Sequence, residues 1–102
     1  MRESKLQSQI KEMLDMHHKV AWCHITTSGR IGSKKYSLGK KGLPDIIGQL
    51  KKAWGGVSLG LEIKRPGERP TQAQEAFLEV IRSNGGLAGW CDSVEGAMEI
   101  LK

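Results

Sequence analysis

The chain has 102 residues, of which 16 are lysine or arginine and 11 are aspartate or glutamate, so its formal net charge is +5. This length suits one domain with a single core, and no apolar run approaches the roughly 20 residues needed to span a bilayer. The basic balance favours polyanionic partners. The polar start of the chain excludes a secretory signal, so we expect a soluble, cytoplasmic protein.

The first third of the chain predicts a helix, a strand and a long loop. Apolar residues recur on one helical face over residues 6–17, and Ser4 and Gln7 have the spacing of a capping box. Residues 20–26 are rich in β-branched and aromatic side chains, which predicts a strand. Residues 27–42 are rich in glycine, serine and lysine, and so long a connection is typical of a functional loop.

Two strands joined by a tight turn are predicted next. Residues 44–50 predict the first strand, which Pro44 can only begin because proline donates no ladder hydrogen bond. A turn over residues 51–56 makes the following strand return antiparallel. Residues 57–64 alternate with period 2, and the apolar face consists of Val57, Leu59, Leu61 and Ile63.

A helix, a short strand and a last helix complete the pattern. Thr71 and Gln74 have capping-box spacing, and the helix that follows has a predicted buried stripe of Ala73, Ala76, Phe77, Val80 and Ile81. Residues 87–91 predict a strand, and Ser93 caps a helix with the stripe Val94, Ala97, Met98 and Leu101. The predicted fold class is α/β, a mixed sheet flanked by helices in the order α-β-β-β-α-β-α. Strands 57–64 and 87–91 would be parallel if they share a sheet.

Several residues suggest a site but have a simpler explanation. Cys23 and Cys91 lack metal-finger spacing and are expected to be reduced core thiols. The adjacent histidines His17 and His18 point in different directions at a helix end, which favours interaction with the helix C-terminus over metal binding. The three tryptophans are expected in the core or in subunit contacts, with Trp54 in the turn as the most exposed.

Asp45, Glu62 and Lys64 can meet at one point on the predicted sheet. Glu62 and Lys64 are two residues apart and share a strand face, and a hairpin closed near residue 54 brings Asp45 opposite Glu62. Two carboxylates repel each other unless a cation intervenes, and an oxygen-rich site suits Mg²⁺ or Mn²⁺. Such an ion can activate water at a phosphodiester, with Lys64 adding positive charge. From spacing alone, an exposed Glu62–Lys64 ion pair and a turn role for Asp45 remain alternatives.

The residues around this cluster resemble the VRR-NUC branch of the PD-(D/E)xK nuclease superfamily. The resemblance rests on Gly42-Leu43-Pro44-Asp45, Glu62-Ile63-Lys64-Arg65-Pro66 and Gln74-Glu75-Ala76-Phe77-Leu78, in that order, and extends from Glu3 to the last helix. It implies a restriction-endonuclease-like fold that hydrolyses DNA phosphodiester bonds.

The resemblance also implies roles for individual residues. A Mg²⁺ ion, with Mn²⁺ able to substitute, would be held by Asp45, Glu62 and the backbone carbonyl of Ile63. Lys64 would be the catalytic lysine. Glu3 and Gln74 occupy the positions of supporting catalytic residues, with helix capping as the alternative for Gln74 and interaction with the positive helix end as the alternative for Glu3.

The basic segment before Asp45 predicts contact with DNA phosphates. Between residues 28 and 42 the chain has five cations and no carboxylate; these are Arg30, Lys34, Lys35, Lys40 and Lys41. Together with Arg65, they are expected to bind the DNA backbone. No recognition helix is predicted, so the DNA should be selected by its shape.

Assembly and substrate follow from the resemblance alone. A stand-alone domain of this size implies a homodimer acting on branched DNA, as a Holliday-junction resolvase in a bacterial or phage-infected cell. Family members embedded in larger DNA repair proteins cut flaps or ends instead. A monomeric flap or end nuclease and a non-cleaving DNA-binding module are the alternatives.

Overall fold

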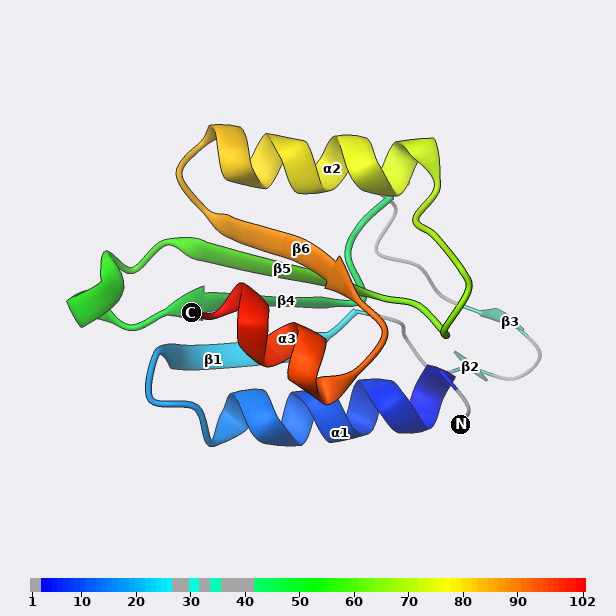
Figure 1. Cartoon of the computed structure of the whole chain (residues 1–102), viewed down its shortest axis with the longest axis horizontal. Helices are drawn as coiled ribbons and strands as arrows, with labels where there is room; N and C mark the ends of the chain where they lie inside the picture. The colour runs from blue at the N-terminus through cyan, green and yellow to red at the C-terminus, as the bar shows by residue number, and fades with distance from the viewer. Residues whose placement is uncertain (1–2, 27–29, 32–33, 36–41) are drawn as a thin grey trace.

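The computed structural model describes residues 3–26, 30–31, 34–35 and 42–102, without the side chains of residues 30, 31, 34 and 35. Four strands form a mixed sheet in the order β1-β4-β5-β6 (Figure 1). Their bounds are Val20–Ile25 for β1, Ile46–Leu50 for β4, Ser58–Ile63 for β5 and Leu87–Cys91 for β6. β4 pairs antiparallel with β1 and β5, whereas β5 and β6 are parallel. This confirms the predicted hairpin and crossover.

Helices cover both faces of the sheet. α1 (Glu3–Asp15) and α3 (Val94–Ile100) share one core with the sheet and contact each other, whereas α2 (Gln72–Ser83) packs on β5 and β6 (Figure 1). The elements of this layered structure follow the order α-β-β-β-α-β-α, as predicted. None of the described helices has the length and apolar character needed to cross a membrane.

The core between the sheet and the α1–α3 layer follows the predicted alternation. Leu59, Leu61 and Ile63 of β5 are buried in it, as are Ile46 and Leu50 of β4. Fully burying one aliphatic side chain of this kind contributes about 1.5–3 kcal/mol. The core also contains Leu6, Ile10 and Leu14 of α1, Ala97 of α3, Leu101 and the free thiols of Cys23 and Cys91. The predicted core thiols are therefore confirmed.

The predicted buried face of α2 was right in part, since Ala73, Phe77 and Ile81 are half-buried. Ala76 and Val80 are exposed, Val80 by 58%, whereas Leu78 is buried. Gln74 is hydrogen-bonded to Glu62 of the sheet, and residues three to four positions apart share a helix face, so Gln74 and Leu78 face inward together.

Three predictions near the ends of helices were also wrong. α1 already includes Ser4, and Gln7 donates a hydrogen bond to Glu3 instead of forming a capping box with Ser4. His17 lies beyond the end of α1, and Met98 of α3 is 48% exposed because its helix has only one face against the core.

The turns and tryptophans differ in detail from the expectation. Within the segment predicted as loop, Arg30–Ile31 (β2) and Lys34–Lys35 (β3) form a short antiparallel pair. The predicted turn contains a short 3₁₀ helix, η1, at Lys52–Trp54. Trp22, at 50% exposure, is more exposed than Trp54 at 41%, because its ring lies on the part of β1 that α2 does not reach.

Candidate active site

Asp45 and Glu62 lie opposite each other at one end of the β4–β5 hairpin. The register pairs Ile46 with Leu61, so the preceding residue on β4 faces the following residue on β5, as predicted. Both side chains are buried, with exposures of 7% for Asp45 and 1% for Glu62. The Ile63 amide donates a hydrogen bond to Oδ2 of Asp45 at 2.9 Å, which fixes this carboxyl group across the two strands.

Pro44 cannot form a ladder hydrogen bond with the Ile63 carbonyl across the hairpin. The same register places Pro44 opposite Ile63, and the bond from the Ile63 amide to Asp45 shows that this peptide edge faces β4. Proline has no N–H group, so it cannot donate the ladder hydrogen bond that the Ile63 carbonyl oxygen would otherwise accept. The sheet therefore leaves this oxygen on the same side as Asp45 without its usual donor.

Thr26 holds the Pro44–Asp45 peptide in place. Its amide donates to the Asp45 carbonyl oxygen at 2.8 Å, and its buried hydroxyl donates to the Pro44 carbonyl oxygen and also lies 3.2 Å from that of Asp45. Sequence reasoning assigned Thr26 only to the end of a strand. Its partners lie 18 and 19 residues away, so no local pattern could have identified this contact.

Gln74 joins the start of α2 to Glu62. Its side-chain Oε1 accepts a hydrogen bond from the Thr71 backbone amide at 2.7 Å, and the Gln74 backbone amide donates to Oγ1 of Thr71, which confirms the capping box. Its Nε2 donates to Oε1 of Glu62 at 3.2 Å. Because a carboxamide has both an acceptor and a donor end, one side chain caps the helix and orients the carboxyl group. The capping box predicted for Gln74 is confirmed, and the same side chain also contacts Glu62.

Gly42 lets the entry to β4 pack against the first turn of α2. Its φ of +84° lies in the left-handed region, and a Cβ atom there would lie 2.4 Å from the Ala73 carbonyl oxygen. Only glycine fits this contact without moving the backbone. The glycine of the Gly-x-Pro-Asp string thus keeps Asp45 and Gln74 on neighbouring segments.

The other predicted site residues vary in how directly they reach this centre. Lys64 is half-buried directly after β5, where its amide donates to the Cys91 carbonyl oxygen at 2.9 Å. Glu3 accepts a hydrogen bond from Gln7 at 3.5 Å. Arg65 is exposed and forms an ion pair with Glu68 at 3.1 Å. The side chains of Arg30, Lys34 and Lys35, and the whole of Lys40 and Lys41, lie outside the described residues.

Comparison with protein families decides what kind of domain carries this geometry. The model of the VRR-NUC domain matches residues 1–95. The chain belongs to the VRR-NUC family. A VRR-NUC domain is a nuclease-type domain that acts on DNA, so the resemblance read from the motifs is confirmed. A comparison with curated proteins found no match.

The electrostatics of this VRR-NUC site centre on Glu62. Its pKa is raised to about 9, first because burial penalises the charged form, and then because the adjacent Asp45 accepts a hydrogen bond from the protonated form and repels the anion. The charge of Lys64 lowers this pKa and that of Glu3 raises it, so both residues lie within electrostatic reach. Oε2 of Glu62 has no hydrogen-bond partner among the described residues.

These properties fit a hard divalent cation. A cation beside Asp45 and Glu62 would remove the repulsion between two carboxylates and occupy the unpartnered Oε2. Among the described residues, no group of three or more His, Cys, Asp or Glu side chains could hold a metal ion. Asp45 and Glu62 are the two carboxyl groups that the described residues bring together at this end of the hairpin.

Proposed function

We propose that this VRR-NUC domain is a metal-dependent endonuclease that hydrolyses DNA phosphodiester bonds at Asp45, Glu62 and Lys64. The observation that supports this most directly concerns Glu62, a buried carboxyl group with a pKa of about 9 beside a second carboxyl group. One of its oxygens has no hydrogen-bond partner among the described residues. A group in this environment stays neutral near pH 7 unless a cation binds it. The family match supplies the substrate class.

Each residue has a role that follows from its contacts. Asp45, Glu62 and the Ile63 carbonyl would hold Mg²⁺, with Mn²⁺ able to substitute; when bound, the ion supplies Lewis-acid charge at the phosphate and lowers the pKa of water. Lys64 brings an ammonium group near Glu62, which suits it to stabilise charge that develops on phosphate oxygens. Gln74 orients Glu62 through its hydrogen bond, and Glu3 supports the cation site through its charge.

For the substrate, we propose branched DNA cut by a homodimer, as in a Holliday-junction resolvase. The observation that supports a homodimer is that the face of β1 and β4 on the side of α2 is partly uncovered, because α2 packs on β5 and β6. Trp22 lies there, half exposed, with its Nε1 donating to Oε1 of Gln49 at 3.0 Å. A half-exposed tryptophan on a partly uncovered sheet face suits a subunit contact.

The test is cleavage of defined DNA structures. The purified protein would be incubated with Mg²⁺ or Mn²⁺ and labelled four-way junction, flap, fork and linear duplex, beside Asp45→Ala and Lys64→Ala. Glu68→Ala serves as the control, because this carboxylate is exposed and paired with Arg65. We expect paired symmetric cuts in the junction by the unmodified protein and by the control, and none by the two site variants.

Other outcomes would redirect the proposal. Cutting that persists in both Asp45→Ala and Lys64→Ala would contradict the site. Intact binding without any cutting would support a non-cleaving module. Cuts confined to flaps or ends, made by a protein that sediments as a monomer, would contradict the resolvase and replace it with a monomeric nuclease.

A further inference from the structure

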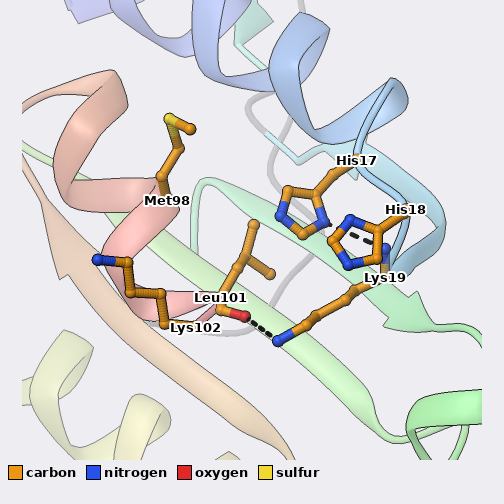
Figure 2. Close-up of a pocket in the computed structure, with 6 residues that line it drawn as sticks. All are labelled: His17, His18, Lys19, Met98, Leu101 and Lys102. Atoms are coloured by element: carbon orange, nitrogen blue, oxygen red, sulfur yellow. Dashed lines mark hydrogen bonds between the residues drawn. The ribbon is translucent and has the colours of Figure 1, made fainter.

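A second concave surface lies at the end of the sheet opposite Asp45 and Glu62. Asp45 precedes β4, whereas Leu50 ends it, and five residues of strand span about 17 Å. Two hollows of about 190 Å³ and 230 Å³ adjoin there and share Lys19, Leu101 and Lys102. We call them together the distal groove. Its first hollow is lined by His17, His18, Lys19, Met98, Leu101 and Lys102 (Figure 2), and the second extends to Leu50, Trp54, Val57 and Leu87.

The distal groove combines apolar walls with a cationic rim. Figure 2 shows Met98 and Leu101 on one side of the first hollow and the rings of His17 and His18 on the other. Met98 is 48% exposed, so a large apolar side chain faces solvent beside this hollow. Burying such surface against a partner is favourable at about 25 cal/mol per Å².

Apart from the two histidines, the acidic and basic side chains that line the distal groove are lysines, among the described residues. No carboxylate lines either hollow among the described residues, whereas Lys19 lines both. Lys51 is exposed next to it, with its amide bonded to the Lys19 carbonyl oxygen at 2.8 Å. Lys102 is paired with Glu99 at 2.8 Å, but both side chains are largely exposed, and such pairs are worth at most about 1 kcal/mol. Lys102 can therefore exchange Glu99 for a carboxylate of a ligand.

The polar groups of the distal groove are already held in place. Nζ of Lys19 donates to the Leu101 carbonyl oxygen at 2.6 Å and lies 5.8 Å from the centre of the Trp54 ring. Nδ1 of His17 accepts a hydrogen bond from the Lys19 amide at 3.1 Å, which leaves Nε2 as the N–H donor of the neutral ring. The two histidine rings stack with centroids 4.7 Å apart. A ligand would lose little side-chain entropy in binding here.

We propose that the distal groove docks an acidic peptide segment of a partner protein. Each hollow is smaller than the roughly 300 Å³ at which small-molecule sites begin, and suits one bulky apolar side chain. The lysines of the rim complement carboxylates. A DNA backbone would satisfy the lysines but has no apolar side chain to fill the hollows, and the site for DNA chemistry lies at the other end of the sheet. The proposal does not depend on nuclease activity.

The test measures peptide binding by the full chain. The probe is a fluorescein-labelled hexapeptide with four acidic residues followed by leucine and phenylalanine, and a matched peptide has serine at the last two positions. We expect fluorescence anisotropy to give a Kd on the order of 10–100 μM for the first peptide. The second should bind at least about tenfold more weakly. Amide NMR shifts should change at Lys19, Met98 and Leu101.

Two variants and one control locate the contact. Met98→Glu adds a negative charge at an exposed position and should weaken binding about tenfold or more, while Lys102→Ala should weaken it several-fold. Lys11→Ala, which removes a lysine paired with Asp15 outside the groove, should leave the affinity unchanged. Junction cleavage by Met98→Glu should equal that of the unmodified protein, which separates this proposal from the proposed function.

Several results would overturn the proposal. These are no binding of the acidic peptide, equal binding of the serine peptide, or unchanged binding by Met98→Glu. Displacement of the peptide by a 20-bp duplex, together with weakened duplex binding by Met98→Glu, would show that the groove contacts DNA instead.

Discussion

Replacing Glu62 with glutamine should make the metal-free protein more stable, and increasingly so as the pH rises. Glutamine keeps the shape of the side chain and an oxygen that can accept the hydrogen bond from Gln74, but it never ionises. Glu62 ionises near pH 4.5 in the unfolded chain and near pH 9 in the folded one. Between these values the unfolded state binds fewer protons, so the unmodified protein loses stability as the pH rises.

The size of the effect follows from the width of this window. Below about pH 4.5 Glu62 is protonated in both states, and above about pH 9 it is ionised in both. The stability gap, which is the difference in free energy of unfolding between Glu62→Gln and the unmodified protein, therefore changes only between these pH values. Each pH unit inside the window corresponds to about 1.36 kcal/mol. From pH 6 to pH 8, the free energy of unfolding of Glu62→Gln should therefore rise by about 3 kcal/mol relative to the unmodified protein.

Urea unfolding followed by tryptophan fluorescence measures this gap at pH 6, 7 and 8 in EDTA. Glu12→Gln is the control, because Glu12 is exposed on α1, and its gap should stay flat across this range. Adding Mg²⁺ at pH 8 should stabilise the unmodified protein and the control, since a cation that binds only the folded state raises stability by mass action. Glu62→Gln should gain much less from Mg²⁺.

Two results would refute this reasoning. A gap that stays constant from pH 6 to pH 8 would show that Glu62 ionises normally in the folded protein, which removes the main observation behind the metal site. Equal stabilisation of Glu62→Gln and the unmodified protein by Mg²⁺ would place the cation elsewhere.

Five further variants test the contacts around this centre. Thr26→Val leaves the Pro44 carbonyl without its donor, so it should lower the free energy of unfolding in urea by about 1–3 kcal/mol and the single-turnover cleavage rate by at least about tenfold. Thr26→Ser keeps the hydroxyl and should retain both the stability and the cleavage rate. Full cleavage by Thr26→Val would refute the positioning role. Gln74→Glu keeps the acceptor for the Thr71 amide but loses the donor to Glu62, so cleavage should fall with little change in stability. Thr71→Ala should instead lower the free energy of unfolding by about 1 kcal/mol with little change in cleavage. Equal behaviour of Gln74→Glu and Thr71→Ala would contradict the double role of Gln74. Gly42→Ala should lower the free energy of unfolding by about 1–3 kcal/mol through its contact with the Ala73 carbonyl, and an unchanged urea midpoint would show that this segment repacks freely.

Features whose interacting residues are close along the chain could be predicted from the order of the amino acids. Glu62 was placed on the face opposite Leu61 and Ile63 because side chains alternate along any strand. The capping box of Thr71 and Gln74 was predictable because its partners are three residues apart. Asp45 was placed opposite Glu62 because a tight turn fixes the register of a hairpin over the few residues that follow it.

Tertiary structure decided which alternative held wherever the partners are distant. The inward face of α2 could be read only in part from its sequence, since apolar residues occupy more than one stripe and the contact of Gln74 with Glu62 selects among them. Burial of Glu62, and with it the raised pKa, exists only once α2 and β4 pack against β5. The same is true of the hydrogen bonds from Thr26 to the Pro44–Asp45 peptide. Desolvation and long-range hydrogen bonding depend on atoms brought together in space, so the sequence could name the two carboxylates, whereas only the fold could show their environment.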